Sequence, residues 1–76
     1  MTAIEMFRIN GFDKYVRETL ISFKRKDTDH YDVIDFWLDK KIVTMRFRNG
    51  KYDETRGMTP EILKAIVKKE LELGWI

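Results

Sequence analysis

Residues 31–48, YDVIDFWLDKKIVTMRFR, are the stretch that decides the fold. Two runs of aromatic and β-branched side chains, 31–38 and 42–48, flank a short polar tip, which is typical of a β-hairpin. A two- or four-residue loop at the tip sets Trp37 opposite Ile42. A three-residue loop would shift the pairing by one residue and destroy the match between the apolar side chains of the two strands, so we exclude it.

The predicted hairpin has one apolar face and one mixed face, because successive side chains of a strand point to opposite sides. The apolar face consists of Ile34, Phe36, Leu38, Val43, Met45 and Phe47. The mixed face consists of Tyr31, Val33, Asp35, Trp37, Ile42, Thr44, Arg46 and Arg48. The apolar face requires a cover from elsewhere in the chain, whereas the mixed face is a candidate for binding.

An amphipathic helix is predicted over residues 60–73. Thr59 suits the N-cap, Pro60 the first helical position, and Gly74 the position after the C-cap. Five apolar side chains share one face at helical spacing: Ile62, Leu63, Ile66, Val67 and Leu73. This face matches the apolar face of the hairpin, so we predict one α+β domain over residues 1–76, a small antiparallel sheet packed on a C-terminal helix.

Glu70 is the one charged residue whose helical angle falls inside that apolar face. Carboxylates are almost never buried without a partner. Either the stem of Glu70 packs while its carboxylate reaches solvent near the helix end, or the carboxylate meets an arginine of a binding partner. Glu70 is therefore included among the candidate binding residues.

The first third of the chain fits two folds. Residues 12–25 carry apolar side chains at helical spacing, but their β-branched and aromatic content also suits strands. Residues 3–9 fit a strand, yet Thr2 and Glu5 have the spacing of a capping box, and Asn10-Gly11 is a hairpin signal. We favour a helix over 12–25. The outcomes are a β-α-β-β-α domain or a β-meander that ends in a helix.

Composition narrows the function classes. The chain has 76 residues, no cysteine and a net charge of +2. The absence of cysteine excludes disulfides, thiolate metal sites and cysteine nucleophiles, and it fits the reducing cytoplasm, where we expect the protein to act. No apolar run approaches a membrane span and the N-terminus lacks the pattern of a leader peptide, so we expect no membrane association.

Catalytic and metal-binding patterns are sparse. Ser22 and His30 are the only serine and the only histidine, and Ser22 lacks the strand–nucleophile–helix context of a serine hydrolase. Asp27, Asp29, His30 and Asp32 crowd together, but the spacing fails the EF-hand pattern, and a turn explains such residues equally well. We expect a protein that is not an enzyme and that uses no metal or cofactor.

The mixed face of the hairpin is the most informative feature for function. Trp37, Tyr31, Arg46 and Arg48 are residue types that are enriched at the centres of protein interfaces. The same interleaving of rings and guanidinium groups suits single-stranded nucleic acid. In the third alternative, residues 12–25 cover this face and its rings are core. We expect a small binding module that acts through a protein partner as an accessory subunit, inhibitor or homodimer, with nucleic acid as the alternative partner.

Overall fold

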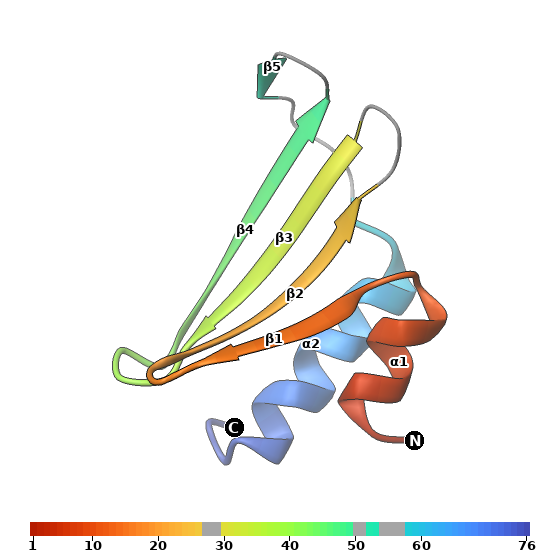
Figure 1. Cartoon of the computed structure of the whole chain (residues 1–76). Helices are drawn as coiled ribbons and strands as arrows, with labels where there is room; N and C mark the ends of the chain where they lie inside the picture. The colour runs from red at the N-terminus through yellow and green to blue at the C-terminus, as the bar shows by residue number, and fades with distance from the viewer. Residues whose placement is uncertain (27–29, 50–51, 54–57) are drawn as a thin grey trace.

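The computed structural model describes residues 1–26, 30–49, 52–53 and 58–76. Its elements are α1 (Ala3–Ile9), β1 (Asp13–Arg17), β2 (Leu20–Lys26), β3 (His30–Trp37), β4 (Ile42–Asn49), β5 (Tyr52–Asp53) and α2 (Pro60–Glu72). The strands form one antiparallel sheet in chain order, and both helices lie on the same side of it (Figure 1). The predicted α+β class is confirmed. Among the described residues, neither helix is long and apolar enough to cross a membrane.

The central hairpin has the predicted register. Trp37 pairs with Ile42 and Ile34 pairs with Met45 across β3 and β4. The connection is the four-residue loop, closed by the Lys41 N–H, which donates to the Trp37 carbonyl at 2.8 Å. β5 pairs with the last two residues of β4. Asn49-Gly50 is a sequence signal for a tight turn, and its second residue lies outside the described residues.

The prediction of a helix over residues 12–25 is wrong. This segment folds into the β1–β2 hairpin, with Arg17 paired to Leu20 next to the turn. The apolar spacing fits both periods, and the strand is selected because it sends Ile21 and Phe23 to the core together. A helix over 12–25 would place Val16 on one apolar stripe with Phe12, Leu20 and Phe23, whereas in the strand Val16 is exposed. The fold is thus a meander that ends in a helix, with a second helix before it.

Residues 3–9 form a helix, and both hydrogen bonds of the capping box are formed at its start. The Thr2 hydroxyl accepts from the Glu5 N–H, and the Glu5 carboxylate accepts from the Thr2 N–H at 3.0 Å. Asn10-Gly11 is the helix end rather than a hairpin turn. Gly11 adopts a φ of +88°, and a Cβ there would lie 3.2 Å from the Arg25 side chain, so both the conformation and the space suit glycine.

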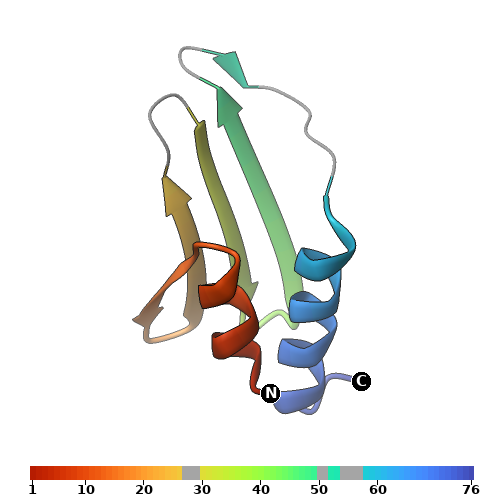
Figure 2. The ribbon, with the colours of Figure 1, turned by 90° about the vertical axis from the view of Figure 1, so that its right-hand side faces the viewer.

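The core is an aromatic cluster between α1 and the sheet. The rings of Phe7 and Phe23 stack with centroids 3.9 Å apart. Phe12 meets Phe7 edge to face, and Phe36 meets both rings edge to face. All four rings are fully or almost fully buried. The other buried members of the cluster are Ile21, Ile34, Ile62, Ala65 and Ile66. Figure 2 shows the two helices side by side in front of the sheet, which closes the core from one side.

The start of α2 follows the prediction, but its orientation differs. Thr59 Oγ1 accepts from the third helical N–H at 3.3 Å, which confirms the N-cap. Leu63 and Val67 were expected in the core, and both are about half exposed. The side of the helix that is buried consists of Ile62, Ala65 and Ile66. The predicted apolar face is wider than the sheet and α1 can cover.

The end of α2 returns the chain to the core. The Gly74 N–H donates to the Leu71 carbonyl and the Trp75 N–H to the Glu70 carbonyl, the pattern of a Schellman motif. Gly74 supplies the positive φ of 75° that this motif needs. The turn places the Trp75 ring 6.2 Å from the ring of Phe36, which adds a cover for the core that the sequence pattern did not predict.

A hydrogen bond also links the start of α1 to the end of α2. Glu72 near the end of α2 accepts a hydrogen bond from the Ala3 N–H at the start of α1, at 2.8 Å. This satisfies a backbone donor that has no partner within its own helix. Lys69 Nζ lies 3.9 Å from Oε1 of the same carboxylate. The pKa of Lys69 is lowered mainly by burial and to a smaller extent by the nearby positive charge of Lys14. The antiparallel arrangement of the helices is fixed by this contact as well as by packing.

We expect Phe23→Ala to destabilise the protein by about 3–5 kcal/mol, since it removes a buried ring that contacts two others. Urea unfolding followed by circular dichroism measures this loss. Val16→Ala on the neighbouring strand is the matched control, and its exposed side chain should cost less than about 0.5 kcal/mol. Similar losses in both variants would show that Phe23 is not central to the core.

The capping box predicts a specific dependence on pH. The pKa of Glu5 is lowered from 4.5, mainly by the hydrogen bond from the Thr2 N–H and to a smaller extent by the bond from the Thr2 hydroxyl. A carboxylate with a lowered pKa stabilises the folded state fully above pH 4.5, and this contribution is lost as the pH falls through the folded-state value. Glu5→Gln keeps the acceptor oxygen but does not titrate.

The difference in unfolding free energy between the wild type and Glu5→Gln should therefore shrink between about pH 7 and about pH 3. Urea midpoints at both pH values measure it. A difference that stays constant across this range would contradict the role of the ionised carboxylate.

Candidate binding face

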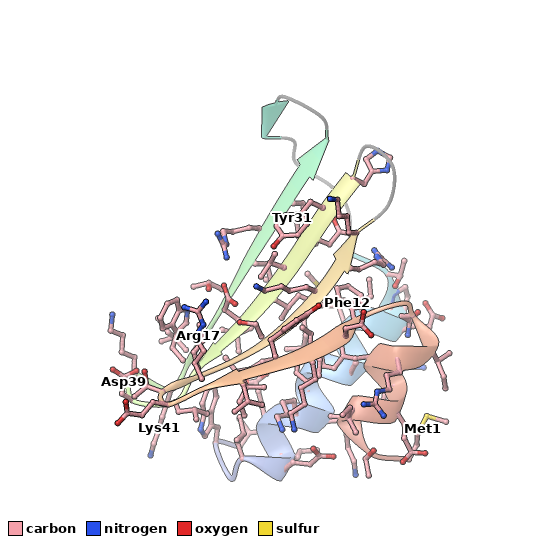
Figure 3. All side chains as sticks on the ribbon, viewed as in Figure 1. Met1, Phe12, Arg17, Tyr31, Asp39 and Lys41 are labelled. Carbon is pink, nitrogen blue, oxygen red and sulfur yellow. The ribbon has the colours of Figure 1, made fainter. Side chains whose placement is uncertain are left out.

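The side of the sheet opposite the helices is called the outer face. By the strand register it consists of Asp13, Tyr15, Arg17, Leu20, Ser22, Lys24, Lys26, Tyr31, Val33, Asp35, Trp37, Ile42, Thr44 and Arg46. Figure 3 shows the side chains of Tyr31 and Arg17 on the side that faces away from the helices. None of the helices among the described residues covers this face.

The centre of the outer face is nevertheless buried. Val33 has no exposed surface, and Asp35 and Ser22 are 3% and 5% exposed. With no helix above them, these residues are covered by the longer side chains around them on the sheet. Lys24 and Arg46 are the cross-strand neighbours of Val33 and form part of this cover.

A buried carboxylate organises this centre. The Ser22 hydroxyl donates to Asp35 Oδ1 at 2.5 Å, and Arg46 Nη2 donates to Asp35 Oδ2 at 3.3 Å. Both oxygens of the carboxylate are therefore engaged, which is how a buried charge avoids a large desolvation cost. The side chain of Arg46 is 62% exposed, so its guanidinium group contacts Asp35 and still reaches solvent.

Two aromatic rings on the outer face lie beneath lysine side chains. Lys24 Nζ is 4.9 Å from the centroid of the Tyr15 ring, and Lys40 Nζ is 5.8 Å from that of the Trp37 ring. Both distances fit a cation–π contact. Trp37 is further oriented by its indole N–H, which donates to Thr44 Oγ1 at 2.8 Å. Rings and positive charges thus alternate across the face in fixed positions.

Positive charge is concentrated on the outer face. Its cations are Arg17, Lys24, Lys26 and Arg46, and its carboxylates are Asp13 at the edge and the buried Asp35. The two helices on the other side of the sheet carry four acidic and four basic residues, which balance. The modest net charge of the chain is therefore distributed unevenly, and the exposed charge of the outer face favours an anionic partner.

The structure brings together three of the five predicted binding residues. Tyr31, Trp37 and Arg46 share the outer face, as the hairpin pattern indicated. Arg48 pairs with Tyr31 in the backbone register, and its side chain lies outside what the structure describes. Glu70 is partly buried on α2, on the other side of the sheet, so it is not part of the same surface.

Several residues of the outer face were missed because residues 12–25 were expected to be helical. Tyr15, Arg17, Ser22 and Lys24 come from β1 and β2, which extend the predicted two-stranded face to four strands. The alternation Tyr15–Arg17 and Leu20–Ser22–Lys24 was the available signal. The alternative in which this segment covers the rings as a helix is excluded, since the segment lies beside them in the sheet.

Of the residues considered for catalysis and metal binding, those that the structure describes do not converge. Ser22 points to the outer face, whereas the alternation along β3 places His30 on the helix side. Asp27 and Asp29 lie outside the described residues. Asp32 accepts from Arg25 Nε and Nη2 at 3.0 and 2.7 Å, and Arg25 Nη1 also donates to the Asn10 carbonyl. This network ties β2 and β3 to the end of α1, a structural role.

Comparison with protein-family models, with curated proteins and with solved structures finds no match for this chain.

The Asp35 network gives a prediction with a matched control in the same row of the sheet. Ser22→Ala should destabilise the protein by about 1–3 kcal/mol, because it leaves a buried carboxylate oxygen without its donor. Thr44→Ala removes a hydroxyl on the other side of Asp35 whose bond to Trp37 is exposed, and it should cost less than about 1 kcal/mol. Urea unfolding compares the two, and equal losses would argue against the network.

Proposed function

We propose that this protein is a non-catalytic binding module whose outer face binds an acidic surface of a protein partner. The observation that carries the proposal is the helix-free sheet face, on which tyrosine, tryptophan and arginine side chains lie among excess positive charges. These residue types supply most of the binding energy at protein interfaces. The absence of cysteine fits a partner in the reducing cytoplasm.

The arrangement supports binding because its parts are held before a partner arrives. Asp35 accepts a hydrogen bond from the Arg46 guanidinium group, and Thr44 accepts one from the indole N–H of Trp37. Side chains that are already positioned lose less conformational entropy on binding. Lys24 and Arg46 project from rows next to the rings, where they can meet carboxylates at the rim of an interface.

A protein partner is favoured over nucleic acid by the state of the rings. Single-strand binding uses aromatic faces on which bases stack. On Tyr15 and Trp37, however, a lysine ammonium group already lies over each ring, and a base must displace it. Asp13 at the edge of the face also opposes a phosphate backbone.

Single-stranded nucleic acid is the second candidate, because rings and cations share one helix-free sheet face. Its distinguishing property is salt dependence. Affinity for an oligonucleotide should fall steeply with added salt as counterions are released from the phosphates, and a mobility-shift titration at low and high salt measures this. Saturable, salt-sensitive binding of single-stranded oligonucleotides would favour this candidate over the protein partner.

We expect Trp37→Ala to weaken binding of the protein partner by at least about tenfold while destabilising the fold by less than about 2 kcal/mol. The full chain serves as bait in a lysate of the cells that naturally produce it. A recovered protein is then purified and titrated against each variant. Val16→Ala, exposed on the helix side of β1, is the control and should bind like the wild type. Unfolding of Trp37→Ala would show that the ring is core, and unchanged affinity would remove Trp37 from the interface.

A further inference from the structure

The helix side of the molecule carries a second surface that neither the fold nor the outer face uses. Leu63, Val67 and Leu71 are 49%, 46% and 53% exposed. With Met6 of α1, they line a shallow groove of about 430 Å³. A single exposed leucine needs no explanation, but several exposed apolar side chains in one contiguous stripe make a candidate interaction site.

The dimensions of the stripe suit a helix. Leu63, Val67 and Leu71 recur every four residues, so they follow the axis of α2 for about 12 Å, or two helical turns. A helix that lies along such a row packs its own side chains, spaced three and four residues apart, between those of α2.

The charges around the groove indicate the chemistry of that helix. The remaining lining residues are Lys64 and Lys68, so the lining contains two cations and no carboxylate. Glu70, which its helical angle places next to Leu63, is not among the lining residues. The lysines alternate with the apolar residues along α2 and lie one turn apart. Glutamates or aspartates that flank the apolar stripe of a partner helix would meet them, which gives the complex orientation as well as charge complementarity.

We propose that this groove docks an acidic amphipathic helix of a partner protein. A second copy of this chain is the weaker occupant. A twofold contact joins the same patch on both subunits, so an antiparallel pair of α2 helices would bring Lys64 and Lys68 of the two copies together. The groove is on the opposite side of the sheet from the outer face, and the inference therefore stands apart from the proposed function.

The test uses a defined probe. A stapled synthetic helix of about five turns, with a leucine stripe flanked by glutamates, is titrated against the full chain by fluorescence anisotropy. Its counterpart carries lysines in place of the glutamates. We expect saturable binding of the acidic peptide below about 1 mM and at least about tenfold weaker binding of the basic one.

Variants locate the binding. Val67→Glu and Leu71→Glu should each lower the affinity for the acidic peptide at least about tenfold. The double variant Lys64→Glu, Lys68→Glu should bind the basic peptide more tightly than the acidic one. Val16→Glu, an exposed position on β1, should leave the affinity unchanged. Circular dichroism confirms that each variant is folded.

Three results would overturn the inference. The first is absence of saturation by the acidic peptide below about 1 mM. The second is binding that Val67→Glu and Leu71→Glu leave intact. The third is a dimer of the wild type, seen by light scattering, that Val67→Glu dissociates, since the groove would then be the contact between two copies of this chain.

Discussion

The stacking of Phe7 on Phe23 determines the layout of the molecule. It places α1 against β2, and the edge-to-face contacts with Phe12 and Phe36 extend the cluster from the start of β1 to β3. α2 then completes the same core with Ile62 and Ile66. Because both helices bury their apolar sides in one cluster, both lie on one side of the sheet. In the part of the chain that the structure describes, no helix lies on the other side.

The one-sided core creates a stability problem that the outer face solves with polar chemistry. A sheet in which Val33 and Asp35 are buried on the outer face needs a cover there, and we infer that side chains of the sheet itself provide it. The Ser22–Asp35–Arg46 network and the contacts of lysines with rings hold those side chains in place. The same contacts fix the positions of Arg46 and Trp37. Stability and preparation for binding therefore depend on one set of interactions.

The sequence predicts those features that depend on local patterns. The β3–β4 register follows from alternation around a polar tip, and both ends of α2 follow from Thr59 and Gly74. The prediction for residues 12–25 is wrong because their apolar spacing satisfies both the helical and the strand period. The packing of Phe23 on Phe7 decides between the two. The outer face was predicted only for its β3–β4 half for the same reason. The Asp35 network needs β2, and no pattern in β3 and β4 alone indicates it.

The spacing of apolar residues along α2 predicts a helix but leaves undetermined which of these residues face the core. Its apolar residues span a wider arc than one contact surface can cover, and the core uses the part that contains Ile62, Ala65 and Ile66. Leu63 and Val67 are left at the surface, where they contribute little to folding and expose apolar area to water. A helix needs one buried stripe to be held in place. The second stripe of α2 is in excess of that need, and the two lysines beside it give it a charge preference that packing within this chain does not require.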